Sequence, residues 1–159
     1  MSVQRAPARE VTFTSSLPQE HHRQLEALLF FNGRQDKVRR GIVDAIDRYG
    51  TPEIVSDARG LRVCVAGPTE AQCVFAIEHI DRSSRPVGLI LYTRDSFERI
   101  TIMHLVVAES YAAGGPYARE HLLLKLVQAV RRVARRTSGI RQVQLLYSQS
   151  KERAATVCV

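Results

Sequence analysis

The sequence has few of the residues that stabilise a small fold covalently or through a metal. It contains three cysteines, an odd number, and no spacing of Cys and His matches a zinc site. No apolar run approaches the roughly 18 residues that a membrane-spanning helix requires. No aromatic residues interleave with its basic groups, which argues against a stacking platform for single-stranded nucleic acid. We therefore expect a fold held by its hydrophobic core, with no bound metal and no membrane span.

The composition is that of a soluble globular protein of one domain. The chain has 159 residues, of which 45% are hydrophobic and 25% charged, and a core can form at this length without disulfides. Residues 1–9 lack the apolar centre of a secretory signal and are expected to be flexible. Two of the cysteines, Cys64 and Cys73, lie in apolar runs and are interpreted as small buried hydrophobes. These features predict a cytoplasmic protein.

Positive charge predominates, with a formal net charge of +7 and a pI near 9.8. Such a charge attracts nucleic acid, an anionic membrane surface or a polyphosphate cofactor, and net charge alone does not distinguish among these three partners. The basic residues gather locally at 37–40 and at 131–136. We interpret both groups as solvated helix faces, so a nucleic-acid partner is compatible with the sequence but is not favoured.

Hydrophobic periodicity and turn residues predict a mixed α/β chain. A short strand at 11–14 is followed by a helix from about Ser16 to Phe30, with Asn32 and Gly33 as its stop signal, and by a second helix over 35–49. Strands are expected at 72–80, 87–93 and 98–108, with an extra strand near 61–66 and a polar connection at 81–86. A long helix then leads to a last strand at 140–147, parallel to the one before it because a crossover joins them.

The centre of the chain, residues 98–136, is a buried strand, a glycine-rich turn and an amphipathic helix. The apolar stripe of that helix consists of Leu122, Leu123, Leu126, Val130, Val133 and Ala134. The first amides of such a helix have no intrahelical partner and lie at the positive end of its dipole. The turn is therefore a candidate site for an anion, typically a phosphate.

This order of elements, with Val107-Ala-Glu-Ser-Tyr-Ala-Ala-Gly-Gly-Pro-Tyr117 at the junction of strand and helix, resembles the GCN5-related N-acetyltransferase superfamily. The resemblance covers about residues 10–147 and implies a fold of the order β-α-α-β-β-β-α-β. It also implies that acetyl-CoA is the cofactor, bound through the pyrophosphate loop that this family places before the long helix. The residues it assigns to cofactor binding are Val106, Val107, Ala108, Ala112, Ala113, Gly114, Gly115, Tyr117 and Arg119.

The loop departs from the family pattern Q/R-x-x-G-x-G/A at its first and last positions. Ala112 stands at the first, only the central Gly115 is kept, and Tyr117 replaces a small residue at the last. Pro116 has no amide to offer a phosphate. Two functions therefore stay open: an acetyl-CoA-dependent N-acetyltransferase that acts on a small-molecule or protein amine by direct transfer, and a non-catalytic interaction or regulatory module that has lost CoA binding.

The end of the chain is short compared with the family. Residues 151–158 resemble a family helix, with Cys158 at the place of a tyrosine that often protonates the leaving thiolate, so 148–159 is expected to be a tail or a helix stub. Without the family's later strands, the strand at 140–147 would expose its edge. We therefore predict a homodimer or a partner chain at this edge.

Direct transfer requires a base for the amine. Two candidates for a catalytic role are Glu78, on the strand at 72–80, and His104, on the strand at 98–108. Strict alternation would place Ile102 and His104 on one face of that strand and Met103 and Leu105 on the other. His104 is equally compatible with a satisfied core histidine.

Overall fold

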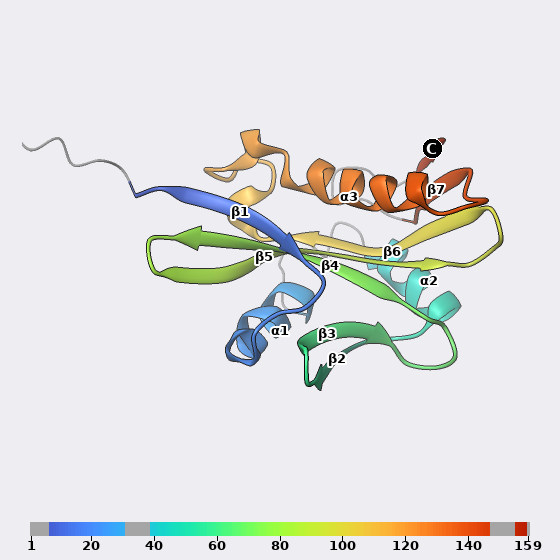
Figure 1. The fold of residues 1–159 in the computed structure, drawn as a ribbon, viewed down its shortest axis with the longest axis horizontal. Coiled ribbons are helices and arrows are strands. Elements are labelled where there is room, and N and C mark those ends of the chain that lie inside the picture. Colours follow the sequence, from blue (N-terminus) through green and yellow to red (C-terminus); the bar gives the residue numbers. More distant parts are fainter. Residues whose placement is uncertain (1–6, 31–38, 147–154, 159) are drawn as a thin grey trace, which may run out of the picture.

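A computed structural model describes residues 7–30, 39–146 and 155–158 of the chain. Its described part contains a six-stranded sheet of order β1-β4-β5-β6-β7-β8 and a separate two-stranded sheet, β2-β3 (Figure 1). The predicted mixed α/β class and the order of the main elements are confirmed. The elements are β1 (Arg9–Thr14), α1 (His22–Phe30), α2 (Arg39–Tyr49), β2 (Pro52–Asp57), β3 (Gly60–Val65), β4 (Gln72–Ile80), β5 (Ser83–Arg94), β6 (Arg99–Val107), α3 (Leu122–Arg136), β7 (Gln142–Leu145) and β8 (Ala155–Cys158).

The main sheet is antiparallel from β1 to β6 and parallel between β6 and β7. Helix α3 makes the crossover between the two parallel strands, as the sequence predicts. The pairing of β7 with β6 covers only Arg99–Ile102 and ends with a hydrogen bond of 3.2 Å from the Leu146 amide to the Ile102 carbonyl. The second half of β6 therefore runs on beyond the end of β7.

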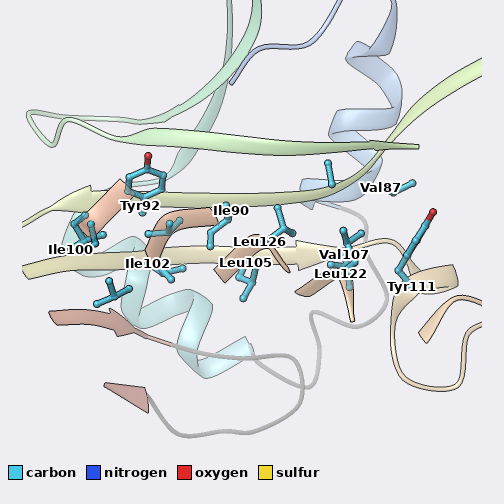
Figure 2. Close-up of a cluster of buried hydrophobic side chains, with 14 of the residues drawn as sticks. Val87, Ile90, Tyr92, Ile100, Ile102, Leu105, Val107, Tyr111, Leu122 and Leu126 are labelled. Atoms are coloured by element: carbon cyan, nitrogen blue, oxygen red, sulfur yellow. The ribbon is translucent and has the colours of Figure 1, made fainter. Parts of the chain in front are cut away.

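Both faces of the sheet are covered, which explains the nearly continuous apolar runs of β5 and β6. On one face, Leu122, Leu126 and Val130 of α3 pack on residues of β5 and β6 in one buried cluster (Figure 2). The other cluster joins α1 and β3 to the opposite face of the same strands. Gly88 of β5 lets α3 approach closely, because a Cβ there would lie 2.9 Å from Leu126 Cδ1.

The turn between β4 and β5 is shorter than the sequence predicts. The expected polar connection over 81–86 is wrong, because β5 already begins at Ser83 and pairs with Ile80 of β4. Asp81 adopts a left-handed conformation with φ of 53°, which Asp tolerates better than most residues. Arg85 and its neighbours therefore belong to the sheet.

Strand β2 is absent from the sequence prediction. It begins at Pro52, within the helix stop Gly50-Thr51-Pro52, and its residues alternate too weakly to be recognised as a strand alone. They form a strand because β3 pairs with all of them, from Pro52 opposite Val65 to Asp57 opposite Gly60. The extra strand predicted near 61–66 is confirmed as β3.

The chain end differs from the prediction of a helix stub. Ala155–Cys158 form β8, which pairs antiparallel with the whole of β7, because the β-branched Thr156 and Val157 favour extended backbone. The edge of β7 is therefore covered, and the expectation of an exposed edge there is wrong. The homodimer stays a prediction, but this reason for it is gone.

The two N-terminal helices lie partly outside the described residues. Helix α1 follows a short 3-10 turn, Gln19–His21, and α2 is described from Arg39 onward. The predicted stop at Asn32 and Gly33 and the predicted start of the second helix lie outside the described residues. In the described ranges, no helix combines the length and the hydropathy of a membrane span.

Candidate functional site

The candidate site is the segment that connects β6 to α3. Val106 and Val107 are buried at the end of β6, and the Ala108 amide donates a hydrogen bond of 2.8 Å to the Val87 carbonyl of β5. A 3-10 turn, Glu109–Tyr111, then leads the chain away from the sheet. The loop at 112–117 is thus fixed to the end of β6, where the family resemblance implies a cofactor site.

Most loop amides that could hold a phosphate are already bonded within the loop. The Ala112 amide donates to the Ala108 carbonyl at 3.2 Å, and the Gly115 amide donates to the Ala112 carbonyl at 2.9 Å. The Tyr117 amide donates to the Ser110 carbonyl at 2.9 Å. Because a backbone N–H has one proton to donate, these amides are not available to a diphosphate in this conformation. The loop does not fit a coenzyme A diphosphate in the way that the resemblance implies.

Gly115 serves the packing of the loop against its own backbone. A Cβ at this position would lie 2.4 Å from the Glu109 carbonyl oxygen and 2.6 Å from that of Ser110. No real Cβ sits so close to a backbone atom, so the loop can fold onto the 3-10 turn only with glycine here. Packing of the loop therefore explains why residue 115 is glycine, and a bound ligand is not needed to explain it.

Helix α3 does not begin directly after the glycine turn. A 3-10 turn, Ala118–Glu120, follows Tyr117, and His121 is left-handed with φ of 51°. Only at Leu122 does the helix start. The sequence predicts that the loop enters the helix directly, and this is wrong because the left-handed His121 turns the chain before the helix.

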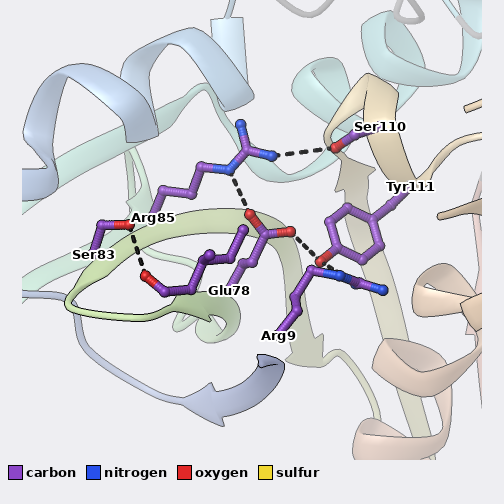
Figure 3. A network of polar contacts seen from close by, with 7 residues as sticks. Arg9, Glu78, Ser83, Arg85, Ser110 and Tyr111 are labelled. Carbon is purple, nitrogen blue, oxygen red and sulfur yellow. Dashed lines mark hydrogen bonds and ion pairs between the residues drawn. The ribbon is translucent and has the colours of Figure 1, made fainter. Parts of the chain in front are cut away.

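Arg9 of β1 holds this segment in place. Its guanidinium donates from Nη1 to the Tyr111 hydroxyl at 3.0 Å (Figure 3). The same group forms an ion pair with Glu120. It also lies over the Tyr117 ring, 3.6 Å from the centroid, in a cation–π contact. The hydrogen bond from Arg9 keeps the pKa of Glu120 below its usual value. One side chain from the start of the sheet thus contacts both ends of the loop.

Glu78 lies beneath the same segment and is only 2% exposed. Its Oε1 accepts a hydrogen bond of 2.9 Å from Arg85 Nε, and its Oε2 accepts one from the Tyr111 hydroxyl. Arg85 also reaches the Ser110 hydroxyl at 3.5 Å (Figure 3). Burial, together with the hydrogen bond to Glu78, raises the pKa of Tyr111 to about 12, so this hydroxyl keeps its proton.

These bonds bear on the predicted catalytic role of Glu78. Both carboxylate oxygens already accept hydrogen bonds from side chains, whereas a general base must accept a proton from the substrate. In this arrangement Glu78 fixes the position of Tyr111. Its catalytic role stays a prediction without support from the contacts around it.

His104 is buried in β6, with 3% of its surface exposed. Burial lowers the pKa of its imidazole to about 4, so it is neutral at physiological pH and a weak base. The expected alternation is wrong around it, because the register between β5 and β6 shifts opposite Leu91 and Tyr92. As a result Leu105 packs in the same cluster as Ile102, and Met103 packs on the other face.

The structure does not bring the two predicted catalytic residues together. Glu78 pairs with Arg85 of β5, and His104 pairs with Leu91 of the same strand. About 20 Å of extended strand separates those two partners, at roughly 3.3 Å per residue. Glu78 and His104 therefore cannot act on one bound substrate as an acid and base pair.

Several residues of the site could not be recognised in the sequence. Arg9 falls in the segment expected to be flexible, and Glu120 has no motif around it. Arg85 falls in the predicted connection at 81–86. Strand periodicity extended by two residues would have placed Arg9 on β1, but its partners lie more than a hundred positions away along the chain.

The predicted cofactor residues are brought together, but with different surroundings. Val106 and Val107 are buried in strand β6, whereas Ala113, Gly114 and Arg119 are exposed on the loop. In the described part of the chain, no group of three or more His, Cys, Asp or Glu side chains lies close enough to hold a metal ion.

Comparisons with known proteins give structural neighbours only. No protein-family model and no curated protein matches the chain. An IAA acetyltransferase from Bacillus cereus ATCC 14579 superposes with a TM-score of 0.45 at 15% identity, over 86% of this chain and 65% of that one. An acetyltransferase from Streptococcus agalactiae 2603 superposes with a TM-score of 0.47 at 17% identity, over 86% of this chain and 71% of that one. The chain is thus similar to two acetyltransferases of known structure, and it spans just under two thirds of the first.

Proposed function

We propose that the chain is an N-acyltransferase that uses an acetyl thioester of the coenzyme A type and transfers the acetyl group to an amine. The observation that supports this proposal is the parallel pair β6–β7, which separates after Ile102. Helix α3 connects these two strands, and the segment at 108–121 lies between β6 and α3. The second half of β6 therefore leads directly into this segment.

The pantetheine part of such a donor is an extended chain with two amides. Such a chain can follow extended protein backbone and bind it through hydrogen bonds. The acetyl thioester supplies an activated carbonyl that an amine attacks, with release of the thiol. The residues that would hold the arm are Val106, Val107 and Ala108.

The diphosphate has no amide cradle in the loop conformation described above. Arg119 is exposed on the loop, and its guanidinium is a suitable partner for a phosphate. The proposal therefore assigns recognition of the donor mainly to its pantetheine arm. In this proposal the phosphates are contacted by side chains such as Arg119 and by no backbone amides of the loop.

A second candidate function is a non-catalytic interaction module. It is favoured by the same loop, because the amides of Ala112, Gly115 and Tyr117 are bonded internally and Arg9 fastens the loop to β1. A basic chain of this kind would then serve a protein or nucleic-acid partner.

Calorimetry with two donors separates these proposals. Acetyl-CoA and acetyl-pantetheine share the thioester and the pantetheine arm, but only acetyl-CoA carries the phosphates. We expect both to bind, with affinities within about tenfold of each other, since the loop adds few phosphate contacts. The variant Arg119→Gln should weaken acetyl-CoA alone, and Arg82→Gln, which removes an exposed charge elsewhere, should weaken neither.

Release of free thiol in the presence of a panel of small amines and lysine peptides then tests transfer. Absence of heat with both donors at millimolar concentration would overturn the acyltransferase proposal and favour the module. Gly115→Trp is not a suitable variant, because any side chain there collides with the backbone of Glu109 and Ser110.

A further inference from the structure

A cavity of about 520 Å³ lies between the β2–β3 hairpin and the beginning of β4. This volume is within the range of pockets that bind small molecules. It is far from the loop at 108–121, because its β4 residues lie at the opposite end of that strand from Glu78. Its lining includes Ser15, Val55, Arg59, Arg62, Gln72 and Cys73.

The cavity exists because two sheets meet there without merging. The pairing of β1 with β4 ends at Thr14 opposite Phe75, so β1 does not extend over 72–74 of β4. Strand β3 belongs to the separate sheet, and a bridge between Leu61 and Leu17 joins it to the segment that follows β1. The space between the hairpin and the first residues of β4 is left as a hollow.

The wall of the cavity is largely apolar. Val55, Cys64 and Val74 line it and are half-buried, whereas Val63 and Cys73 pack in the core on the α1 face of the sheet. The polar groups of this wall are partly paired, since the Tyr92 hydroxyl donates to Gln72 Oε1 at 3.0 Å. Such a wall suits the hydrocarbon or aromatic part of a ligand.

The rim of the cavity carries an excess of positive charge. Arg59 and Arg62 both line it. Asp57 forms an ion pair with Arg62 and accepts the Arg59 amide at 2.8 Å, so one carboxylate stands against two guanidinium groups. In the described part of the chain, no acceptor is bonded to the Arg59 guanidinium. A smaller hollow of about 250 Å³ beside it has one charge of each sign, Glu70 and Arg94, and lacks this excess.

We propose that this cavity binds an amphiphilic organic anion, with its carboxylate or sulfonate at Arg59 and Arg62 and its apolar part against Val55 and Val74. An arginine fork matches the two oxygens of a carboxylate, and charge-assisted bonds of this kind are the stronger ones. The apolar wall supplies the rest of the binding free energy through buried surface. The site is separate from the proposed thioester site and does not depend on it.

Octanoate and octan-1-ol form a matched pair of probes, since they share the alkyl chain and differ in the charged head. By calorimetry we expect saturable binding of octanoate, with octan-1-ol at least about tenfold weaker because it lacks the charge-assisted bonds. The double variant Arg59→Gln/Arg62→Gln should weaken octanoate by about tenfold or more and leave octan-1-ol unchanged. Arg82→Gln, at the β4–β5 turn, is the charge-matched control and should not alter the binding of either probe.

A second variant tests the cavity itself. Val55→Phe places a ring in the hollow, because Val55 lies opposite Arg62 on the same face of the hairpin. It should abolish binding of octanoate, with circular dichroism used to verify that the chain remains folded. The proposal is overturned if octanoate and octan-1-ol bind equally, if Val55→Phe binds octanoate as the unaltered chain does, or if acetyl-pantetheine displaces octanoate.

Discussion

At the scale of single residues, the carboxylate of Glu78 owes its position to partners from two other segments. Arg85 of β5 and Tyr111 of the 3-10 turn each bond one of its oxygens. A carboxylate buried in this way is stable only while its donors are present, because an uncompensated buried charge is costly. The hydrogen bond from the Tyr111 hydroxyl thus offsets part of the free energy that burying the Glu78 carboxylate costs.

The variant Tyr111→Phe should lower the free energy of unfolding by about 1 to 3 kcal/mol, since it removes the hydroxyl from Glu78 Oε2 and from Arg9. Urea denaturation measures this change. The matched control is Tyr117→Phe, which keeps the ring beneath Arg9, and it should change stability by much less. An equal loss in both variants would contradict the role assigned to the Tyr111 hydroxyl.

His104 should make stability depend on pH. Its pKa is about 4 in the folded chain and near 6.5 when unfolded, so the unfolded state binds the proton more tightly. Above about pH 6.5 the imidazole is neutral in both states and has no effect. As the pH falls from about 6.5 to 4, the folded state should lose about 3 kcal/mol on this account.

Urea denaturation of the unaltered chain and of His104→Gln over this pH range tests the assignment. Between about pH 6 and 4.5, the difference between their free energies of unfolding should change with pH at close to the slope expected for uptake of one proton on unfolding. A difference that is flat with pH would show that His104 takes up no proton on unfolding.

At the scale of elements, β1 is tied to the segment between β6 and α3 through Arg9. The contacts are the hydrogen bond to Tyr111, the ion pair with Glu120 and the stacking on Tyr117. Because Arg9 and Glu120 are partly exposed, the ion pair itself contributes modestly to stability. The main effect of Arg9 is on how firmly the loop is held.

Replacement of Arg9 by Gln should therefore loosen the loop more than it destabilises the whole chain. Hydrogen exchange at the Gly115 and Tyr117 amides should become at least about tenfold faster, while amides in the middle of β5 exchange as before. Arg82→Gln again serves as the control for loss of one positive charge. Equal acceleration in the loop and in β5 would indicate global destabilisation instead.

The sequence predicts those elements whose own pattern is sufficient. The bounds of β4 at Gln72 and Ile80 match the prediction, and the stripe from Leu122 to Ala134 locates α3. Strands β2 and β8 escape prediction because they become strands through pairing with β3 and β7, and a partner strand cannot be read from local periodicity.

The candidate site is predicted in position but not in detail. Val107 and Gly115 locate the end of β6 and the loop correctly. The acceptors of the loop amides include the carbonyl of Ser110, so they depend on the position of the 3-10 turn. Tertiary contacts of Tyr111 with Arg9 and Glu78 fix that turn. Residue spacing along the chain carries no information on those contacts.

At the scale of the whole molecule, the last strand determines which edge the main sheet presents on the β7 side. Strand β8 covers the edge of β7, with Val157 opposite Val143. An open edge is a template for pairing with another chain, so its cover limits association through this edge. A homodimer through the edge of β7 would have to displace β8, which is the terminal strand of the sheet on this side.

The variant Val157→Pro should test this role of β8, since proline removes a backbone amide and does not fit within a ladder. Light scattering over a range of concentrations should show stronger association in this variant than in the unaltered chain. An equal mass for both at all concentrations would contradict the assignment of β8 as the cover of β7.

The bridge between Leu17 and Leu61 has a consequence for motion. Two backbone hydrogen bonds, of 2.9 and 2.7 Å, fasten the β2–β3 hairpin to the end of β1. Any swing of the hairpin away from the main sheet must break both bonds at once, and the same swing widens the mouth of the cavity between them. The amide protons of Leu17 and Leu61 should therefore exchange at one common rate, and an anion that fills the cavity should slow both together.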